Sequence, residues 1–219
     1  MRARQKSHSS TIPLDTSSSI PAEYHAVRFY DTDASLARIV AEFLREGLDG
    51  GSPGIVVATA NHRAEIIREL TARSFDVPAL QRSQNLVLLD AEGILAGFMT
   101  DGKPDAAKFQ DQMRRVIDGV SRGRGACTVR IFGQMVDVLW QRGERDAAIR
   151  LEMLWNQLAR TEAFSLLCGY VIGNFYKDAG LEDICGQHTH IVSAADMATG
   201  LVSEACDTNR RRRERHGRR

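Results

Sequence analysis

The feature that most constrains the fold is a regular alternation of short apolar segments with segments of helical periodicity. Five segments have the continuous or alternating apolar pattern of strands, at His25–Tyr30, Ile55–Thr59, Leu86–Asp90, Thr128–Phe132 and Phe164–Val171. Between them, apolar residues recur every three or four positions, which predicts helices over residues 36–44, 62–73, 104–120 and 144–160. Strands that alternate with helices form right-handed units around a mostly parallel sheet. We therefore expect an α/β fold.

The ends of the chain differ from its centre in composition. Residues 1–21 are polar and rich in Ser and Thr, so we expect a disordered N-terminal segment. Residues 22–195 have the length and the apolar content of one globular domain. Residues 196–219 form the remainder, in which a weaker helix over 193–209 is predicted to lead into a disordered Arg-rich tail.

The distribution of charge limits the class of partner. Residues 22–209 hold 26 acidic and 19 basic side chains, which argues against a nucleic-acid surface on the fold itself. The segment Arg210–Arg219 contains seven arginines, so a nucleic-acid contact is expected only there, and a solubilising end is the alternative. No apolar stretch is long enough to span a bilayer. The four cysteines form no CxxC pair, and we expect reduced thiols in a cytoplasmic protein without membrane contact.

A set of motifs spread over the whole domain carries a family resemblance. They comprise His25 with Phe29-Tyr30, Phe43-Leu44-x-x-Gly47-Leu48-x-x-Gly51, His62-Arg63, Phe98-Met99-x-Asp101-Gly102-x-Pro104-Asp105, Arg130-x-Phe132-Gly133-Gln134-Met135-Val136, Leu139-Trp140-x-x-Gly143, Leu151-Glu152-x-x-Trp155-Asn156-x-Leu158, Leu167-Cys168-x-Tyr170, and His188. Over residues 24–195 the chain resembles the MEDS family, the sensory domain of methanogens and methylotrophs named after the DcmR regulator. One position departs from the family, which commonly has Glu where this chain has Gln134.

The resemblance implies a RecA-like three-layer sandwich, because the MEDS family is related to KaiC-like members of the RecA superfamily. It also implies a sensory role in transcriptional or two-component signalling, with a small hydrocarbon derivative as the proposed ligand. In relatives the domain is often joined to a DNA-binding or histidine-kinase output. We find neither here, so the expected partner is a separate signalling protein, a second copy of the chain, or whatever binds the Arg-rich tail.

The expected nucleotide site is degenerate. A phosphate-binding loop requires GxxxxGK[ST] between a strand and a helix, because backbone N–H groups and a lysine hold the phosphates. The corresponding segment, Tyr30–Ser35, has no Gly and no Lys but contains Asp31 and Asp33. The strand end at Gln134 also lacks the acid that would hold Mg²⁺. We therefore predict a non-catalytic protein without a cofactor; the alternatives are a RecA-like switch with residual ATP binding and, for the two Asp residues, a simple turn and helix cap.

Ligands of parallel α/β sheets bind at the carboxyl ends of the strands. Aromatic, polarisable and hydrogen-bonding side chains at or near those ends suit a small, weakly polar ligand. The predicted ligand-binding residues are Tyr30, Asp31, His62, Arg130, Gln134, Met135 and Tyr170. The alternative is that Tyr170 and Met135 belong to the core and that His62 caps the helix that follows it.

One further motif, Cys185-x-x-His188-x-His190, has the residue types of a metal site. Zinc needs four ligands, so the fourth would have to come from Cys168, Cys127 or His25. The sequence favours no metal at this place and a loop with one buried thiol instead. We interpret His25, at the start of a strand, as a structural histidine. Cys168 lies inside a strand, and we interpret it as a buried, unreactive thiol.

Overall fold

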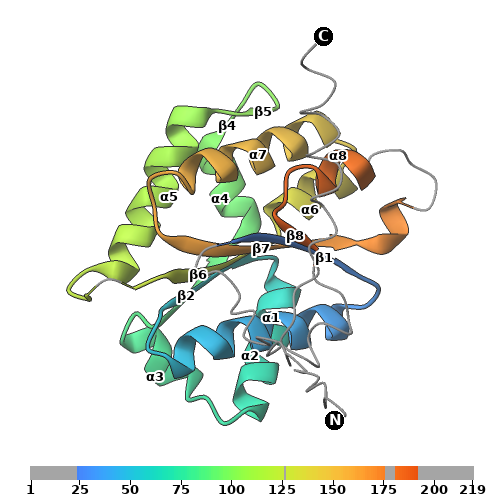
Figure 1. Ribbon diagram of the computed structural model, residues 1–219. Coiled ribbons are helices and arrows are strands. Elements are labelled where there is room, and N and C mark those ends of the chain that lie inside the picture. The colour runs from blue at the N-terminus through green and yellow to red at the C-terminus, as the bar shows by residue number, and fades with distance from the viewer. Residues whose placement is uncertain (1–23, 126, 176–180, 192–219) are drawn as a thin grey trace, which may run out of the picture.

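The computed structural model describes residues 24–125, 127–175 and 181–191, which form three layers with a sheet between two layers of helices (Figure 1). The sheet has six parallel strands in the order β3-β2-β6-β7-β1-β8. Their bounds are β1 (His25–Tyr30), β2 (Gly54–Ala58), β3 (Leu86–Asp90), β6 (Val129–Gly133), β7 (Phe164–Val171) and β8 (His190–Ile191). The first strand of the chain therefore lies between the last two, and its Val27 is in register with Cys168 of β7.

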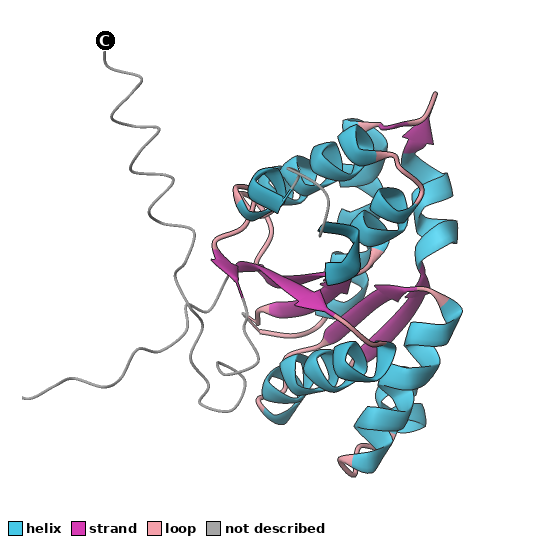
Figure 2. Cartoon of the chain, turned by 90° about the vertical axis from the view of Figure 1, so that its right-hand side faces the viewer, coloured by secondary structure: helices cyan, strands magenta, loops and turns pink. Residues whose placement is uncertain are grey.

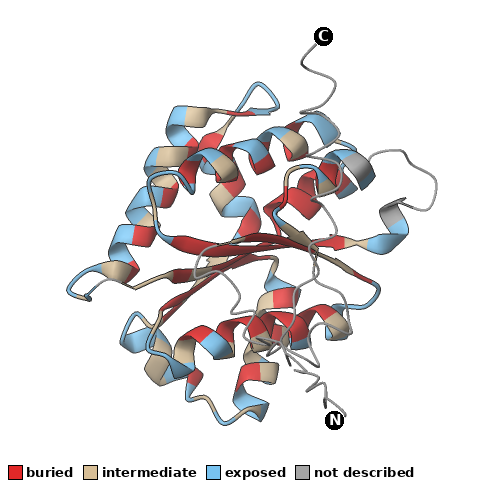
Figure 3. Cartoon of the chain, in the orientation of Figure 1, coloured by how far each residue is buried: buried red, intermediate tan, exposed pale blue. Residues whose placement is uncertain are grey.

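Helices cover both faces of the sheet, as the side view shows (Figure 2). One face is covered by α1 (Asp33–Asp49), α2 (Ala60–Ala72) and α3 (Val77–Arg82). The other is covered by α4 (Ala91–Phe98), α5 (Ala106–Ser121), α6 (Met135–Gln141), α7 (Arg145–Leu158) and α8 (Leu181–Cys185). Because both faces are covered, the central strands are almost continuously buried (Figure 3).

The core consists of two apolar clusters, one on each face of the sheet. On the α4–α8 face, Trp155 contacts Phe109 and Phe164 edge to face, with ring centroids 5.0 and 5.8 Å apart. Trp140 is also buried and lies edge to face with Tyr170. Both tryptophans therefore anchor the core.

The five predicted strands are present within one residue of their expected bounds. The expectation that Pro104 lies in the first turn of a helix is wrong. Pro104 pairs with Met99 in a two-stranded hairpin of β4 (Met99–Thr100) and β5 (Lys103–Pro104), and Asp105 caps α5 by accepting a hydrogen bond from the Lys108 amide. The predicted helix over 193–209, the N-terminal segment and the Arg-rich tail lie outside the described residues.

Two short elements follow β7, the 3₁₀ helix η1 (Ile172–Phe175) and α8. Within the described part of the chain, no helix has the length and apolar character that crossing a membrane requires.

Candidate functional site

Buried polar side chains gather at the carboxyl edge of the sheet. We call Tyr30, Thr59, His62, Gln134 and Asp137 the edge group; all are buried except Thr59, which is half-buried. They come from the end of β1, the junction of β2 with α2, and the junction of β6 with α6. These are the strand ends at which ligands of parallel α/β sheets bind.

Asp137 connects three elements at this edge. Its Oδ2 atom accepts hydrogen bonds from the Tyr30 hydroxyl at 2.9 Å and from Gln141 Nε2 at 2.6 Å, and its Oδ1 accepts one from the Val171 amide at 3.1 Å. Burial raises the pKa of Asp137 although these bonds favour the carboxylate, and burial beside Asp137 also raises the pKa of Tyr30. The carboxylate is thus fully engaged by protein donors.

Gln134 and His62 complete the edge group. Gln134 Oε1 accepts a hydrogen bond from the Thr59 amide at 3.0 Å, which fixes the start of α2. His62 Nδ1 lies 3.3 Å from Thr59 Oγ1, and the imidazole packs edge to face with the Tyr30 ring at 5.9 Å. His62 Nε2 lies 3.0 Å from Asp33 Oδ1 but makes no aligned hydrogen bond among the described residues. This nitrogen is the one buried polar atom of the edge group left without such a bond.

The turn between β1 and α1 satisfies its own polar groups. Thr32 is the N-cap, and its hydroxyl accepts a hydrogen bond from the Ser35 amide at 3.2 Å. The Ser35 hydroxyl donates to Asp31 Oδ1 at 2.9 Å, which lowers the pKa of Asp31. Asp31 and Asp33 are exposed at the turn. Two carboxylates therefore occupy the place at which a phosphate-binding loop would present N–H groups and a lysine.

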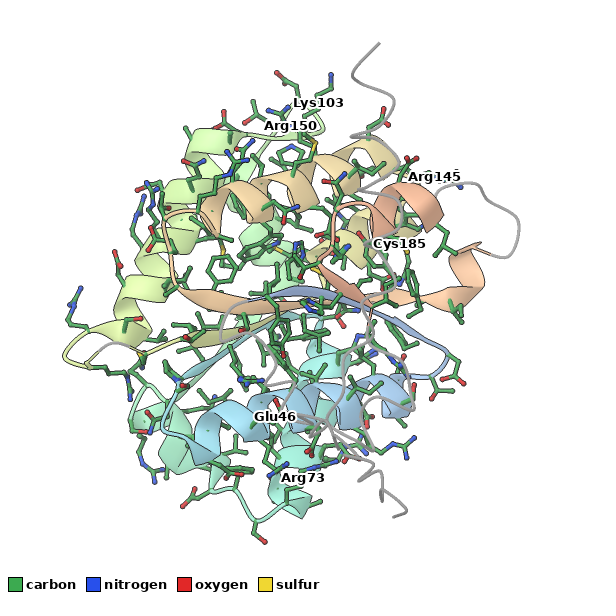
Figure 4. All side chains as sticks on the ribbon, viewed as in Figure 1. Glu46, Arg73, Lys103, Arg145, Arg150 and Cys185 are labelled. Carbon is green, nitrogen blue, oxygen red and sulfur yellow. The ribbon has the colours of Figure 1, made fainter. Side chains whose placement is uncertain are left out.

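Arg130 lies away from the edge group, near the amino end of the sheet, where it is in register with Gly54. Its guanidinium donates to Glu46 Oε2 at 2.8 Å and to the Phe43 carbonyl at 3.1 Å (Glu46 is labelled in Figure 4). The Arg130 side chain also crosses Gly47 so closely that a Cβ there would lie 2.7 Å from Arg130 Cδ. Arg130 therefore attaches α1 to the sheet.

The two remaining predicted ligand-binding residues are also separate from the edge group. Met135, the first residue of α6, is fully buried in the apolar cluster on the α4–α8 face of the sheet. Tyr170 is fully buried as well, and its hydroxyl donates to Glu152 Oε1 at 2.7 Å. Tyr170 therefore contacts a second set of polar side chains.

This second set, which we call the inner group, consists of His25, Glu152, Cys168 and His188, all of them buried. They come from the start of β1, from α7, from β7 and from the segment just before β8. Their potential ligand atoms all lie within 4.8 Å of one another. His25 Nε2 is 3.1 Å from Glu152 Oε2 and 3.4 Å from Cys168 Sγ, and His188 Nε2 is 3.3 Å from Glu152 Oε1.

The outer nitrogens of both histidines face hydrogen-bond acceptors. His188 Nδ1 lies 2.7 Å from the Ile184 carbonyl oxygen, which can only accept. His25 Nδ1 lies 2.9 Å from Asn156 Oδ1, and the amide of Asn156 is oriented by its own donation to the Gln187 carbonyl at 2.8 Å. Both Nδ1 atoms therefore carry a proton, and in the neutral imidazoles both Nε2 lone pairs point into the inner group.

Burial and neighbouring charges set the ionisation of the inner group. Burial and His188 lower the pKa of His25, although Glu152 opposes this. Burial alone would raise the pKa of Glu152, but His188 and His25 outweigh it and hold this pKa below its usual value. Burial and the carboxylate of Glu152 raise the pKa of Cys168 well above the usual thiol value. A carboxyl group, a thiol and two imidazoles thus meet in the buried interior of the domain.

Comparison with known proteins identifies the family. A family model described as the methanogen/methylotroph, DcmR sensory domain (MEDS) matches residues 24–189. The chain belongs to the MEDS family. This confirms the resemblance carried by the sequence motifs, and it indicates a sensory or regulatory role. Among curated proteins, none matches the chain.

The fold of this MEDS domain is similar to the crystal structure of a KaiC-like protein from the hyperthermophilic archaeon Pyrococcus horikoshii. The TM-score is 0.53 at 13% sequence identity, over 77% of this chain and 70% of that chain. At this identity the similarity shows the fold alone. It confirms the predicted RecA-like arrangement of a parallel sheet between two layers of helices.

The three residues of the predicted metal motif, Cys185, His188 and His190, do not lie together in the MEDS domain. His188 belongs to the inner group, whereas Cys185 and His190 do not. Cys185 is partly buried on α8 (Figure 4), and the His190 ring lies edge to face with Tyr24 at 5.7 Å. Two of the three residues considered as a fourth ligand, His25 and Cys168, lie beside His188, but Cys127 does not.

Three residues of the two groups were not predicted as site residues: Thr59, Asp137 and Glu152. Thr59 stands at a strand end but gave no distinct signal, whereas the two acids did. A signal for each was present, because each interrupts an otherwise apolar helical face, at Met135–Trp140 and at Leu151–Trp155. An acid among apolar neighbours of a buried helix needs a partner in the core. Both acids have such partners in the structure.

Proposed function

We propose that this MEDS domain is a non-catalytic sensory module that acts in transcriptional or two-component signalling by binding a small ligand or a signalling protein. The observation that carries the proposal is the β1–α1 turn, where Thr32, Asp31 and Ser35 satisfy one another and two acids replace a phosphate-binding loop. Triphosphate binding at such a turn is opposed by charge repulsion from Asp31 and Asp33 and by the lack of a lysine.

The edge group also supports a role without phosphoryl transfer. Gln134 stands at the end of β6, where a carboxylate would be needed to hold a magnesium ion, and its oxygen is engaged by the Thr59 amide. Asp137, three residues further along the chain, is buried and accepts hydrogen bonds from protein donors. These residues can hold the strand ends together. Neither of them has a free carboxylate with which to bind the magnesium ion of a nucleotide.

A small, weakly polar ligand fits the chemistry of this edge. Tyr30 and His62 supply ring faces and edges, and His62 Nε2 is a buried nitrogen without an aligned hydrogen bond among the described residues. A ligand that carried one hydrogen-bonding group could satisfy this nitrogen, and the two rings would exclude water from its apolar part. Since the family resemblance implies a hydrocarbon derivative as the ligand, the proposed ligand class is a small halogenated or one-carbon compound.

The signal would be passed to a second molecule. The proposed recipient is a separate signalling protein or a second copy of the chain, since the described residues form the sensory fold alone. Contact of Arg210–Arg219 with nucleic acid is a further proposal, based on the charge of that segment.

A thermal-shift screen of halogenated and one-carbon compounds tests the proposal, with nucleotides included. A ligand at 100 times its Kd adds about 2.7 kcal/mol to the free energy of unfolding. We expect a stabilising compound whose effect is lost in His62→Ala and kept in Asn61→Ala, a substitution at an exposed position of the same helix. Stabilisation that is equal in both variants would contradict binding at the edge group.

Isothermal titration of Mg-ATP provides the opposing test. We expect no micromolar binding to the full chain. Binding of Mg-ATP at micromolar concentration would overturn the proposal in favour of a nucleotide-binding switch.

A further inference from the structure

The inner group has more converging lone pairs than its protons can satisfy. Since both Nδ1 atoms hold a proton, each Nε2 atom that is not itself protonated directs a lone pair toward Glu152, which is also an acceptor. The Tyr170 hydroxyl donates to Glu152 Oε1, and the Cys168 thiol, 3.4 Å from both His25 Nε2 and Glu152 Oε2, has one proton to donate. His188 Nε2 makes no hydrogen bond among the described residues although it is buried. Such an atom needs a donor or a cation that the described side chains do not supply.

The distances within the group match the edges of a coordination tetrahedron. An ion with bonds of about 2.0–2.3 Å places tetrahedral ligand atoms roughly 3.3–3.8 Å apart. Of the six pairs among the four ligands, four are separated by 3.1, 3.3, 3.4 and 3.4 Å, with Glu152 presenting Oε2 to His25 and Cys168 and Oε1 to His188. The other two pairs, from His188 to His25 and to Cys168, lie within 4.8 Å. A small inward or outward movement of the side chains would therefore accommodate an ion at the centre.

The surroundings of the two histidines are those of metal ligands. In protein metal sites, a ligating imidazole usually donates its other N–H to a carbonyl or carboxylate, which fixes the ring and makes the ligating nitrogen more basic. His188 donates to the Ile184 carbonyl, and His25 donates to Asn156, which is itself held by the Gln187 carbonyl. The backbone is fixed as well, because the His25 carbonyl accepts from the Thr189 amide and hydroxyl, both at 2.8 Å.

We propose that His25, Glu152, Cys168 and His188 form a binding site for a divalent transition-metal ion of the zinc class. Two imidazoles, one thiolate and one carboxylate are ligands typical of Zn²⁺, whereas Mg²⁺ and Ca²⁺ take oxygen ligands. The thiolate and the carboxylate together balance the charge of a divalent ion, and the thiol proton leaves to solvent when the ion binds. The inference goes beyond the proposed sensing role and does not depend on it.

The site is closed rather than catalytic. All four side chains are buried, and four protein ligands leave no open position for a water molecule or a substrate. The ion would join the start of β1, the middle of β7, α7 and the segment that carries α8 and β8. Binding would therefore attach residues 181–191 to the sheet and stabilise the α7 side of the domain.

The test is the metal content of the full chain, purified without a histidine tag and without chelator after growth with zinc. We expect one zinc ion per chain by elemental analysis in the wild type, in Cys185→Ser and in His190→Gln. These two variants are matched controls, since they remove the same residue types at nearby positions outside the group. In Cys168→Ser and in His188→Ala we expect zinc affinity to fall by roughly 100-fold or more.

Cobalt and a non-ligand variant distinguish loss of a ligand from loss of the fold. Co²⁺ bound to the wild type and to Cys185→Ser is expected to show thiolate-to-cobalt charge-transfer absorption, which Cys168→Ser lacks. Asn156→Ala keeps all four ligands and should weaken zinc binding by about 10- to 100-fold without changing the stoichiometry. A wild-type chain that binds no zinc, or charge-transfer absorption that is lost in Cys185→Ser and kept in Cys168→Ser, would overturn the proposal.

Discussion

The edge group and the inner group are both buried and polar, but they differ in how their hydrogen bonds are balanced. At the edge, Asp137 meets donors from Tyr30, Gln141 and the Val171 amide, so its acceptors are satisfied by the protein. In the inner group, nitrogen, sulfur and oxygen acceptors face one another around Glu152. At the strand ends, His62 Nε2 is the buried polar atom left without an aligned hydrogen bond, whereas beneath α7 several acceptors converge around Glu152.

The difference between the edge group and the inner group is tested most strongly by substituting Glu152. In Glu152→Ala the buried Tyr170 hydroxyl and the Cys168 thiol lose their acceptor and a cavity is left in the core, so the free energy of unfolding should fall by about 3–5 kcal/mol. Urea unfolding measures this change, and zinc should enlarge the difference because it binds the wild type more tightly. Met153→Ala, at the exposed neighbouring position, is expected to change stability by less than about 0.5 kcal/mol. Equal effects of the two substitutions would show that the inner group does not stabilise the fold.

A smaller effect is expected at the edge, from Asp137→Ala. The Tyr30 hydroxyl and the Val171 amide would each lose a buried acceptor, which should lower the free energy of unfolding by about 2–3 kcal/mol. Zinc should have no influence on this loss, since Asp137 lies outside the inner group. Urea unfolding with and without zinc checks both statements, and a zinc-dependent loss would contradict the separation of the two groups.

Arg130 belongs to neither group, and Gly47→Ala tests its structural role. The new Cβ would lie 2.7 Å from Arg130 Cδ and displace a side chain held by Glu46 and by the Phe43 carbonyl. Overpacking of this kind should cost about 1–2 kcal/mol. Gly119→Ala in α5 is the matched control, because nothing lies within 4 Å of its Cβ position and alanine favours the helix by up to about 1 kcal/mol. Thermal unfolding should move in opposite directions for the two variants.

The smallest expected effect is a pH dependence at the edge. Burial raises the pKa of Asp137 above its usual value of 3.8, so the folded state binds this proton more tightly than the unfolded state. The resulting contribution to stability is present below pH 3.8 and is lost as the pH rises through the raised pKa. Asp137→Asn removes this dependence, and the unfolding free energies of variant and wild type should therefore diverge across that pH window. Parallel urea-unfolding curves over the window would contradict a raised pKa.

The sheet could be predicted from the sequence because its central strands are continuous apolar runs, as Phe164–Val171 illustrates. The short helices α3, α4 and α6 could not, since six to eight residues give too little periodicity to distinguish a helix from a loop. Pro104 was misplaced because a proline that precedes a helix also fits a hairpin strand, and only the pairing with Met99 decides between them.

The two polar groups differed in how far the sequence could locate them. Tyr30, His62 and Gln134 each follow a strand, and the rule that parallel strands end at one edge brings them together. The inner group depends on the order of the strands, which places His25 beside residues more than a hundred positions later. His188 was singled out with its sequence neighbours Cys185 and His190, but its partners come from other segments. Sequence spacing cannot reveal such partners.

The position of β1 between β7 and β8 has a consequence for how the chain reaches its structure. The first strand to be synthesised has no neighbour in the sheet until Phe164–Val171 has been made, and His25 meets Thr189 only after that. Contacts this distant in sequence must close a long loop before they contribute any free energy, which slows folding. During translation, both hydrogen-bonding edges of β1 therefore stay unpaired until nearly the whole domain has emerged from the ribosome.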